Sequence, residues 1–282
     1  MNQAEFSHRF WPDNFLIFGC GNMGGAILRG WIAAGIDPAR FTVVDPFAPN
    51  LPDGVQYFSD AAQVTEQFGA VLLSIKPQML SQLSAAIAPL IAPDALLLSI
   101  LAGAKCAAIS AAFPQARVVR LMPNLAAQIG KSPLGLWSYD LSDTQQQALS
   151  RMLSPLGTPF WLDGEAQMDA FTALAGSGPA FIYRFLDTLA AAGTQLGLDA
   201  EQTTQMTLAM AEGAVQLATQ SGENPRDLAA RVASAGGSTA AGLAVLDAGE
   251  ALLHLTQSTL DAATRRNGEL ANIAEQASND KR

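Results

Sequence analysis

The sequence has little cysteine, little histidine and few positive charges. Its 282 residues include two cysteines and two histidines, and 16 Lys or Arg stand against 25 Asp or Glu, for a net charge of -9. Cys20 and Cys106 lie far apart with no metal-ligand spacing around them, which excludes a disulfide framework and a zinc site. We therefore expect no metal and a reducing, cytoplasmic location. The negative charge opposes non-specific binding to nucleic acid, so we expect no such partner.

A long apolar stretch is also missing. The run from Ala95 to Ala104 is interrupted by Ser99 and Gly103, and it is far shorter than the roughly 20 residues that a membrane-spanning helix needs. Residues 1–14 mix charged and aromatic residues, unlike a signal peptide, so we expect them to form a short leading arm. No membrane partner is expected.

The sequence is rich in apolar residues, which make up 49% of the chain against 15% charged residues, and its length suits two domains. In residues 1–163, short apolar runs alternate with helix-length segments. This order predicts an α/β, Rossmann-type, doubly wound parallel sheet that binds a dinucleotide, with strands covered on both faces. The expected strands are Phe15–Phe18, Phe41–Val44, Ala70–Ile75, Ala95–Leu101, Arg117–Leu121 and Gly157–Asp163.

Residues 164–282 are expected to form an all-α domain for substrate binding and dimerisation. Strand-like runs end at Asp163, and Ala, Leu, Gln and Thr dominate the segments that follow. Many of these segments are apolar on more than one face, so we expect them to bury against a second copy in a homodimer at least. A self-contained helical bundle is the alternative. The predicted helices are Glu165–Ala173, Pro179–Leu196, Ala200–Ser221, Pro225–Ala233, Thr239–Ala248 and Ala251–Ala277.

A G-x-G-x-x-G pattern follows the first predicted strand and opens a helix. In this context the first glycine permits a tight turn, the second lets a pyrophosphate approach the backbone, and the third allows close helix packing. The helix N-terminus then stabilises the phosphate charge. A simple glycine turn is the alternative reading. The residues of this predicted cofactor site are Gly19, Cys20, Gly21, Asn22, Met23 and Gly24.

Asp45 ends the second predicted strand, where an acidic side chain binds a ribose 2′-hydroxyl and repels a 2′-phosphate. No Lys or Arg occurs between Phe41 and Ile75 to hold that phosphate. Of the two nicotinamide cofactors, NADH and NADPH, the sequence therefore favours NADH. Alternatively, Asp45 and Pro46 only form a capped turn.

Two further segments follow strands and are expected to line the cofactor crevice at the carboxyl edge of the sheet. The first consists of Ser74, Ile75, Lys76 and Pro77, and the second of Met122, Pro123 and Asn124. Lys76 is alternatively an ordinary surface lysine at a strand end.

A glycine-rich loop precedes the predicted helix that begins near Thr239. Its backbone amides are expected to bind an anion, for which a substrate carboxylate is the natural occupant. The alternative is an N-cap within a loop between two helices. The predicted substrate-binding residues are Ser234, Gly236, Gly237, Ser238 and Thr239. The earlier segment Gly176–Pro179 fits a proline at the first position of a helix, a cofactor contact, or both.

These motifs, in this order and together with 172–180 and 263–270, resemble the pyrroline-5-carboxylate reductase family. The resemblance implies the last step of proline biosynthesis, the NAD(P)H-dependent reduction of 1-pyrroline-5-carboxylate, a ring imine bearing a carboxylate, to L-proline. It implies that Thr239 is the catalytic residue beside the ring nitrogen, and that the protein forms interlocked dimers or larger rings. Ala235, the loop 131–133 and the segment 250–253 depart from the usual family sequence.

The sequence offers no convincing general acid or base. His8 lies in the arm, and His254 is flanked by leucines, which indicates a core or interface position. An imine needs less help, because its protonated form already attracts hydride and positioning suffices. One alternative is a related cyclic-imine or hydroxyacid reductase, although the chain has no lysine between Lys131 and Lys281 to act as the acid-base of the latter. The second alternative is a sensor protein that binds a dinucleotide without catalysing a reaction.

Overall fold

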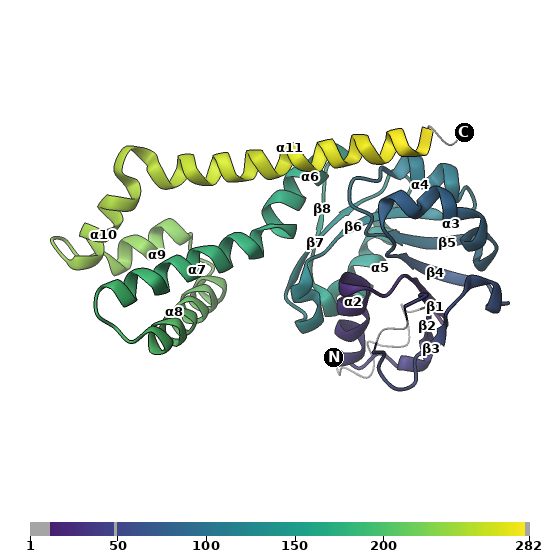
Figure 1. Ribbon diagram of the computed structural model, residues 1–282, viewed down its shortest axis with the longest axis horizontal. Coiled ribbons are helices and arrows are strands. Elements are labelled where there is room, and N and C mark those ends of the chain that lie inside the picture. The colour runs from purple at the N-terminus through teal and green to yellow at the C-terminus, as the bar shows by residue number, and fades with distance from the viewer. Residues whose placement is uncertain (1–11, 48–49, 280–282) are drawn as a thin grey trace. The chain divides into compact units, whose positions relative to one another are not determined.

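The computed structural model describes residues 12–47 and 50–279, with side chains described up to residue 271 in the last helix (Figure 1). The predicted arm therefore lies largely outside the described residues, as does His8. Contacts divide the chain into two compact units. The first, here called the sheet unit, runs to Gly176 and continues from Ala263. The second, the helical unit, spans Ser177–Ala262.

The sheet unit is built on one eight-stranded sheet with the order β3-β2-β1-β4-β5-β6-β7-β8. Strands β1 to β6 are parallel and have the doubly wound Rossmann order, which confirms the predicted fold class. Strand β7 runs antiparallel to β6, and β8 runs parallel to β7. The strands are β1 (Phe15–Phe18), β2 (Phe41–Val44), β3 (Gln56–Phe58), β4 (Phe68–Leu73), β5 (Ile91–Ser99), β6 (Arg117–Met122), β7 (Ser132–Trp137) and β8 (Gly157–Trp161).

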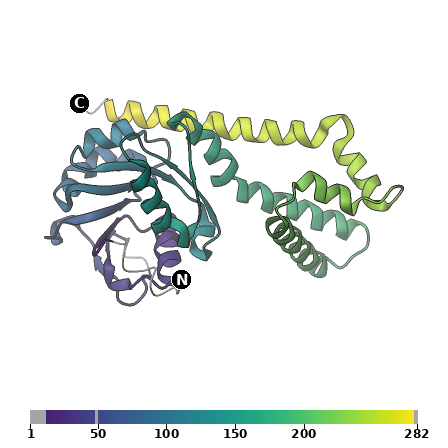
Figure 2. The same cartoon turned by 180° about the vertical axis from the view of Figure 1, so that it is seen from behind.

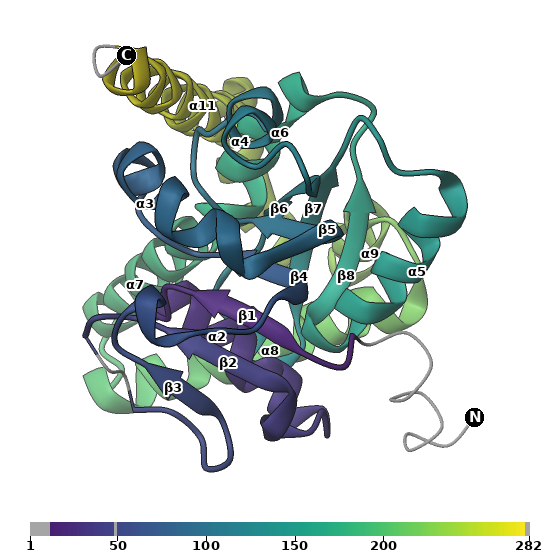
Figure 3. The same ribbon diagram turned by 90° about the vertical axis from the view of Figure 1, so that its right-hand side faces the viewer.

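Helices cover both faces of this sheet, as Figure 3 shows. Helices α2 (Asn22–Ala33) and α5 (Asp143–Leu153) share one apolar core, whereas α3 (Leu80–Ile87) and α4 (Cys106–Ala112) share another. Successive residues of β1 enter opposite cores, because strand side chains alternate between the two faces. All four residues of this strand are therefore buried, which explains its unalternating apolar sequence.

The sheet unit continues beyond the predicted domain boundary at 163/164, because a buried ion pair holds the next segment. The Oε1 atom of Glu165 accepts hydrogen bonds from Arg120 Nη1 of β6 at 3.0 Å and from the Cys106 backbone N at 2.7 Å. This carboxylate therefore also binds the start of α4. The segment comprises a 3-10 turn (Glu165–Gln167), α6 (Met168–Phe171) and a π-helical turn (Thr172–Gly176). The domain boundary itself stays a prediction.

The end of helix α11 (Ala251–Asn279) also belongs to the sheet unit. The Asn267 side chain donates a hydrogen bond to the Asp169 carbonyl at 3.2 Å. A Cβ added to Gly103 would lie 2.8 Å from the Ala271 backbone, so the helix passes closer than a side chain there allows. The boundaries between the two units, at 176/177 and 262/263, therefore do not coincide with the change in amino-acid composition after Asp163.

The helical unit confirms the predicted all-α character, and its helix bounds lie close to the predicted ones. The helices are α7 (Gly178–Gln195), α8 (Ala200–Ser221), α9 (Pro225–Val232), α10 (Ser238–Asp247) and the first part of α11. Helices α7 and α8 lie side by side (Figure 2). Their close contact is at Gly193, where an added Cβ would lie 2.7 Å from the Thr203 methyl.

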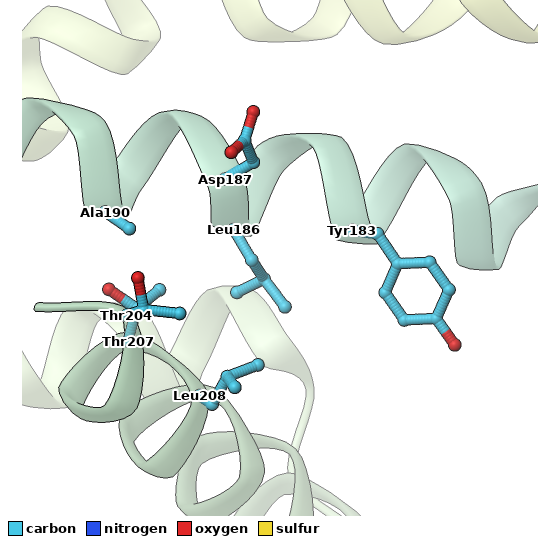
Figure 4. A pocket seen from close by; sticks show the side chains of 7 residues that line it. All are labelled: Tyr183, Leu186, Asp187, Ala190, Thr204, Thr207 and Leu208. Carbon is cyan, nitrogen blue, oxygen red and sulfur yellow. The ribbon is translucent and has the colours of Figure 1, made fainter. Parts of the chain in front are cut away.

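The helical unit has almost no core of its own. Of residues 177–262, all of which the structure describes, only Thr203 is buried. Between α7 and α8, Leu186 and Leu208 border a hollow of about 210 Å³ (Figure 4). Contiguous exposed apolar surface of this size is typical of a surface that contacts another protein chain or domain. In the helical unit, the large apolar side chains that are at least half exposed are Ile182, Tyr183, Leu196, Leu198, Leu208, Met210, Val215, Leu217, Val232, Val245, Leu253 and Leu255.

His254 is on this exposed surface. Its side chain is 65% exposed, and Nε2 lies 3.9 Å from the Glu250 carboxylate one helical turn earlier. The core alternative for His254 is therefore wrong, because this part of α11 is exposed and the neighbouring Leu253 and Leu255 are at least half exposed as well. The interface alternative stays a prediction. In the described part of the chain, none of the helices is long and apolar enough to cross a membrane.

We predict that Glu165→Ala destabilises the protein by about 2–3 kcal/mol, because it leaves Arg120 buried without its partner charge. The Arg120 side chain is 7% exposed and that of Glu165 is 22% exposed, so solvent only partly compensates the loss. Thermal unfolding at one fixed protein concentration measures this effect, since self-association makes the midpoint depend on concentration.

The control for this prediction is Asp94→Asn, which removes one charge of an ion pair with Arg117 whose partners are 82% and 39% exposed, and Asn tolerates the φ of +59° at this position. Exposed pairs contribute about 0–1 kcal/mol, so this variant should unfold near the wild-type temperature. Equal shifts for the two variants would contradict the structural role of Glu165.

Candidate functional site

The glycine turn after β1 uses each of its three glycines differently. Gly19 has φ +86°, and a Cβ there would lie 2.5 Å from the Ser74 carbonyl oxygen. A Cβ on Gly24 would lie 2.6 Å from the Gly19 carbonyl oxygen, whereas one on Gly21 would meet nothing within 4 Å. The outer glycines thus allow close packing, and the middle one borders open space. The open space at Gly21 fits the dinucleotide-binding motif, in which the second glycine lets a pyrophosphate approach the backbone, better than a simple glycine turn.

Helix α2 begins at this turn without a side-chain cap. Its N-cap is Gly21, and its first turn contains no acidic residue. By contrast, Ser142, Asp199 and Asn224 cap α5, α8 and α9 through their side chains. The first backbone N–H groups of a helix need partners from outside the helix, and a phosphate is a suitable one.

A cavity of about 450 Å³ lies beside the uncapped end of α2. It brings together six predicted cofactor residues from the ends of β1, β2 and β4, namely Gly19, Gly21, Asp45, Ser74, Ile75 and Lys76. Apolar side chains, among them Phe47, Met79 and Leu83, complete its lining. The cavity suits the adenosine half of a dinucleotide, with apolar walls for a base and a carboxylate for a ribose. Cys20, Asn22, Met23, Gly24, Pro77, Met122, Pro123 and Asn124 are not among its lining residues.

Asp45 connects the glycine turn to the end of β2. Its Oδ2 accepts a hydrogen bond from the Cys20 backbone N at 2.6 Å, and its Oδ1 accepts one from the Phe47 backbone N at 2.8 Å. The bond from Phe47 is the turn cap that the sequence left as an alternative, and the bond from Cys20 ties the glycine turn to the end of β2. The ribose contact stays a prediction.

The Cys20 thiol has no role as a nucleophile at this site. Burial, followed by the negative charge of Asp45, raises its pKa to about 11. The thiol is therefore protonated at neutral pH, and a protonated thiol neither attacks an electrophile nor binds metal well.

Asp60 is a second carboxylate in the cavity lining, which the sequence analysis missed. It lies after β3, and its Oδ1 accepts a hydrogen bond from the Ala62 backbone N at 2.9 Å. The strand β3 was not predicted, so nothing in the sequence placed Asp60 near the cofactor. The lining thus carries two carboxylates, from Asp45 and Asp60, and one ammonium group, from the exposed Lys76.

The segment Met122–Asn124 follows β6 at the same edge of the sheet. Pro123 is buried, and Asn124 is 6% exposed. The Asn124 side chain accepts a hydrogen bond from the Ala126 backbone N and donates one to the Ala175 carbonyl, both at 2.9 Å. The Asn124 side chain is therefore engaged within the protein, and its predicted contact with a cofactor stays a prediction.

In the helical unit, the predicted substrate loop leads directly into α10. Gly237 is the N-cap, no side chain caps the helix, and the first turn has no acidic residue. Gly236 has φ +71° with nothing within 4 Å of an added Cβ. The Gly237 backbone N donates to the Ser234 carbonyl at 2.9 Å, which closes the loop. The backbone amides that follow form an open N-terminus with the geometry of an anion site.

The hydroxyl groups at this open N-terminus differ in exposure. Ser234 and Ser238 are exposed, whereas Thr239 is half-buried. The Thr239 hydroxyl forms no side-chain hydrogen bond with any residue that the structure describes. It is therefore available to a ligand held by the helix N-terminus. The substrate-binding role of all five predicted residues stays a prediction.

Comparisons with known proteins agree with this architecture. Residues 165–270 match the family model for pyrroline-5-carboxylate reductase dimerisation, and residues 14–103 match that for NADP oxidoreductase, coenzyme F420-dependent. The pyrroline-5-carboxylate reductase of Pseudomonas aeruginosa is 36% identical over 90% of this chain and 95% of its own length. That of Methanosarcina acetivorans is 31% identical over 81% of this chain and 87% of its own.

Two solved structures share the fold over nearly the whole chain. The pyrroline-5-carboxylate reductase of Coxiella burnetii is 28% identical, with a TM-score of 0.82 over 92% of this chain and 98% of that one. The pyrroline carboxylate reductase of Plasmodium falciparum, solved with NADP bound, has a TM-score of 0.80, 23% identity and the same coverage. Because its sequence is 36% identical to a pyrroline-5-carboxylate reductase across nearly the full length of both proteins, the chain belongs to the pyrroline-5-carboxylate reductase family.

Proposed function

We propose that this protein reduces the ring imine of 1-pyrroline-5-carboxylate to L-proline with a reduced nicotinamide dinucleotide. The observation that carries the proposal is that two glycine-rich loops each lead into a helix whose N-cap is a glycine without a side-chain cap, Gly21 at α2 and Gly237 at α10. One suits a pyrophosphate and the other a carboxylate. The reductases of Pseudomonas aeruginosa and Methanosarcina acetivorans carry this activity in their names, and both match most of the chain.

The residues around the glycine turn fit a dinucleotide. The open space at Gly21 leaves room for a pyrophosphate against the backbone, and the cavity beside it has apolar walls. Asp45 would bind the ribose, while the first amides of α2 would bind the pyrophosphate. When bound, the reduced nicotinamide supplies a hydride.

The residues at the start of α10 would hold the substrate. The backbone amides after Gly237 bind its carboxylate, and the Thr239 hydroxyl orients the ring nitrogen. Because the protonated imine is already electrophilic and takes its proton from solvent, the protein needs to position the ring more than to transfer protons. The hydroxyl-rich, histidine-free loop from Ser234 to Thr239 is suited to this task.

We infer a preference for NADH over NADPH. The cavity lining carries the carboxylates of Asp45 and Asp60 against the single ammonium group of Lys76. A 2′-phosphate would meet net negative charge there, and no arginine lines the cavity to bind it in a bidentate manner.

We also infer that the helical unit is covered by a second copy of the chain. Its helices leave large apolar side chains exposed and bury only Thr203. The segment 165–270 matches a dimerisation family model, which indicates the same partner. A cytoplasmic location is supported by the two cysteines, both free and buried.

The first test follows absorbance at the nicotinamide band when pure protein is mixed with NADH or NADPH and 1-pyrroline-5-carboxylate. We predict oxidation of the cofactor by the wild type. Thr239→Ala should lower kcat/KM by about 10- to 100-fold, the loss expected for one polar contact to the reacting group. The Kd for NADH should stay unchanged, because Thr239 is assigned to the substrate.

Thr219→Ala makes the same chemical change on α8 and serves as the control. Its hydroxyl bonds only to the Val215 carbonyl of its own helix, so its activity should equal that of the wild type. No oxidation by the wild type with either cofactor would refute the proposed reaction. Equal losses of NADH binding and turnover in Thr239→Ala would show that the substrate site is misplaced.

For the cofactor preference, we predict that Asp45→Asn lowers the ratio of kcat/KM for NADH to that for NADPH by about tenfold, equivalent to about 1.4 kcal/mol of removed repulsion. Asn keeps the size of the side chain but only one of the two acceptors that bind the Cys20 and Phe47 amides, and any resulting loss that is common to both cofactors cancels in the ratio. Steady-state kinetics with both cofactors measure the ratio. Asp53→Asn, which removes an exposed carboxylate on the same β2–β3 connection but outside the cavity lining, should leave it unchanged. A wild type that prefers NADPH would contradict the assignment.

For self-association, we predict that Leu255→Asp shifts the protein from dimers or larger assemblies to monomers in light scattering at micromolar concentration. Leu255 is 67% exposed on α11, and burying an unpaired carboxylate in an apolar interface is strongly unfavourable. The matched control is Ile129→Asp, because Ile129 is 69% exposed on the sheet unit. A monomeric wild type at this concentration would disprove the cover by a second copy.

A further inference from the structure

Asn124 belongs to the segment Met122–Asn124, which is called the crevice wall here because it is predicted to line the cofactor crevice, and which lies outside the lining of the cavity beside α2. It follows β6 and is the N-cap of the 3-10 helix Leu125–Ile129, whose Ala126 amide it caps through Oδ1 at 2.9 Å. Its backbone N donates to Ser132 Oγ of β7, also at 2.9 Å. Asn124 is 6% exposed, so these bonds form away from solvent. The position of the residue is thus fixed from two sides.

The remaining polar group of the side chain reaches a distant segment. Asn124 Nδ2 donates to the carbonyl of Ala175, 51 residues later in the chain. Ala175 belongs to the π-helical turn Thr172–Gly176. Single π turns inside helices are rare and occur frequently at functional sites. A partly buried backbone carbonyl needs a donor, and the Asn124 side chain of the crevice wall supplies one to Ala175.

The crevice wall and the π turn also lie near each other beside this hydrogen bond. A Cβ added to Gly176 would be 3.7 Å from the Met122 sulfur, which is van der Waals distance. The Met122 side chain therefore borders the same turn whose Ala175 carbonyl accepts the Asn124 hydrogen bond.

We propose that Asn124 is a positioning residue for hydride transfer, which acts by holding the π turn against the crevice wall through the Ala175 carbonyl. This inference rests on the proposed reductase function. The amide suits the task, because it accepts a bond for the cap and donates one to the carbonyl at the same time. A serine would cap the 3-10 helix but not reach Ala175, and an aspartate would face the carbonyl oxygen with negative charge.

The test compares Asn124→Ser and Asn124→Asp with the wild type. Both variants keep a cap acceptor for the Ala126 amide, and thermal unfolding checks that each is folded, above all Asn124→Asp, which places a charge at a position only 6% exposed. We expect kcat to fall by about tenfold in Asn124→Ser and further in Asn124→Asp, while the KM for NADH changes by less than about twofold. The primary kinetic isotope effect with deuterated NADH should increase, because a misplaced donor slows the hydride step itself.

The control is Gln128→Ser, which removes an exposed amide from the same 3-10 helix and should leave kcat and the isotope effect unchanged. Wild-type kcat in both Asn124 variants would overturn the inference. So would parallel losses of kcat and NADH affinity, since these would indicate a general structural defect.

Hydrogen–deuterium exchange provides a readout that needs no substrate. Exchange in peptides covering 172–180 should be faster in Asn124→Ser than in the wild type or in Gln128→Ser. Unchanged exchange would overturn the proposed clamp. A wild type that does not oxidise NADH would refute the reductase function, and the exchange result would still decide whether Asn124 holds the π turn.

Discussion

The site depends on the fact that parallel strands all end at the same edge of a sheet. Strands β1, β2, β4 and β6 deliver the glycine turn, Asp45, the Ser74–Pro77 segment and the Met122–Asn124 segment to that edge. The turn lies so close to the neighbouring strand that a Cβ on Gly19 would be 2.5 Å from the Ser74 oxygen. The hydrogen bond from the Cys20 amide to Asp45 then fixes it from the other side. Backbone packing, more than any catalytic side chain, shapes this part of the molecule.

The sequence predicted the elements whose signals are local. Strand β1 is a continuous apolar run and β2 is apolar except for Thr42, while α8 is bounded by Asp199 and Gly222, which are recognisable helix signals. Strand β3 was missed because three partly exposed residues give no periodicity, and β7 because Pro133 and Gly135 are typical of loops. The extent of the sheet unit was also unpredictable. It depends on a buried ion pair between residues 45 positions apart, which no local pattern marks.

In the candidate site too, local motifs were predicted from the sequence and tertiary contacts were not. The glycine turn and the open start of α10 follow from short motifs with a known physical purpose, and the structure gives both the expected local geometry. The identity of the substrate came from resemblance to a family, because an anion site accepts many carboxylates. The contribution of Asp60 and the partner of Asn124 depend on tertiary contacts. From the sequence, an asparagine after a strand is interpreted as a helix cap or a ligand contact. No pattern in the sequence predicts that Asn124 also donates a hydrogen bond to Ala175, 51 residues later.

The glycine-capped N-termini of α2 and α10 have a consequence for the protein in the cell. Glycine offers no side-chain acceptor, so the first backbone N–H groups of both helices are suited to a bound anion as their partner. Ligands that bind only the folded protein add to its stability as their concentration rises. Proteases degrade the transiently opened form, so each molecule should survive longest when its own metabolites are abundant. The supply of substrate and cofactor would then set the amount of this protein as well as its rate of work.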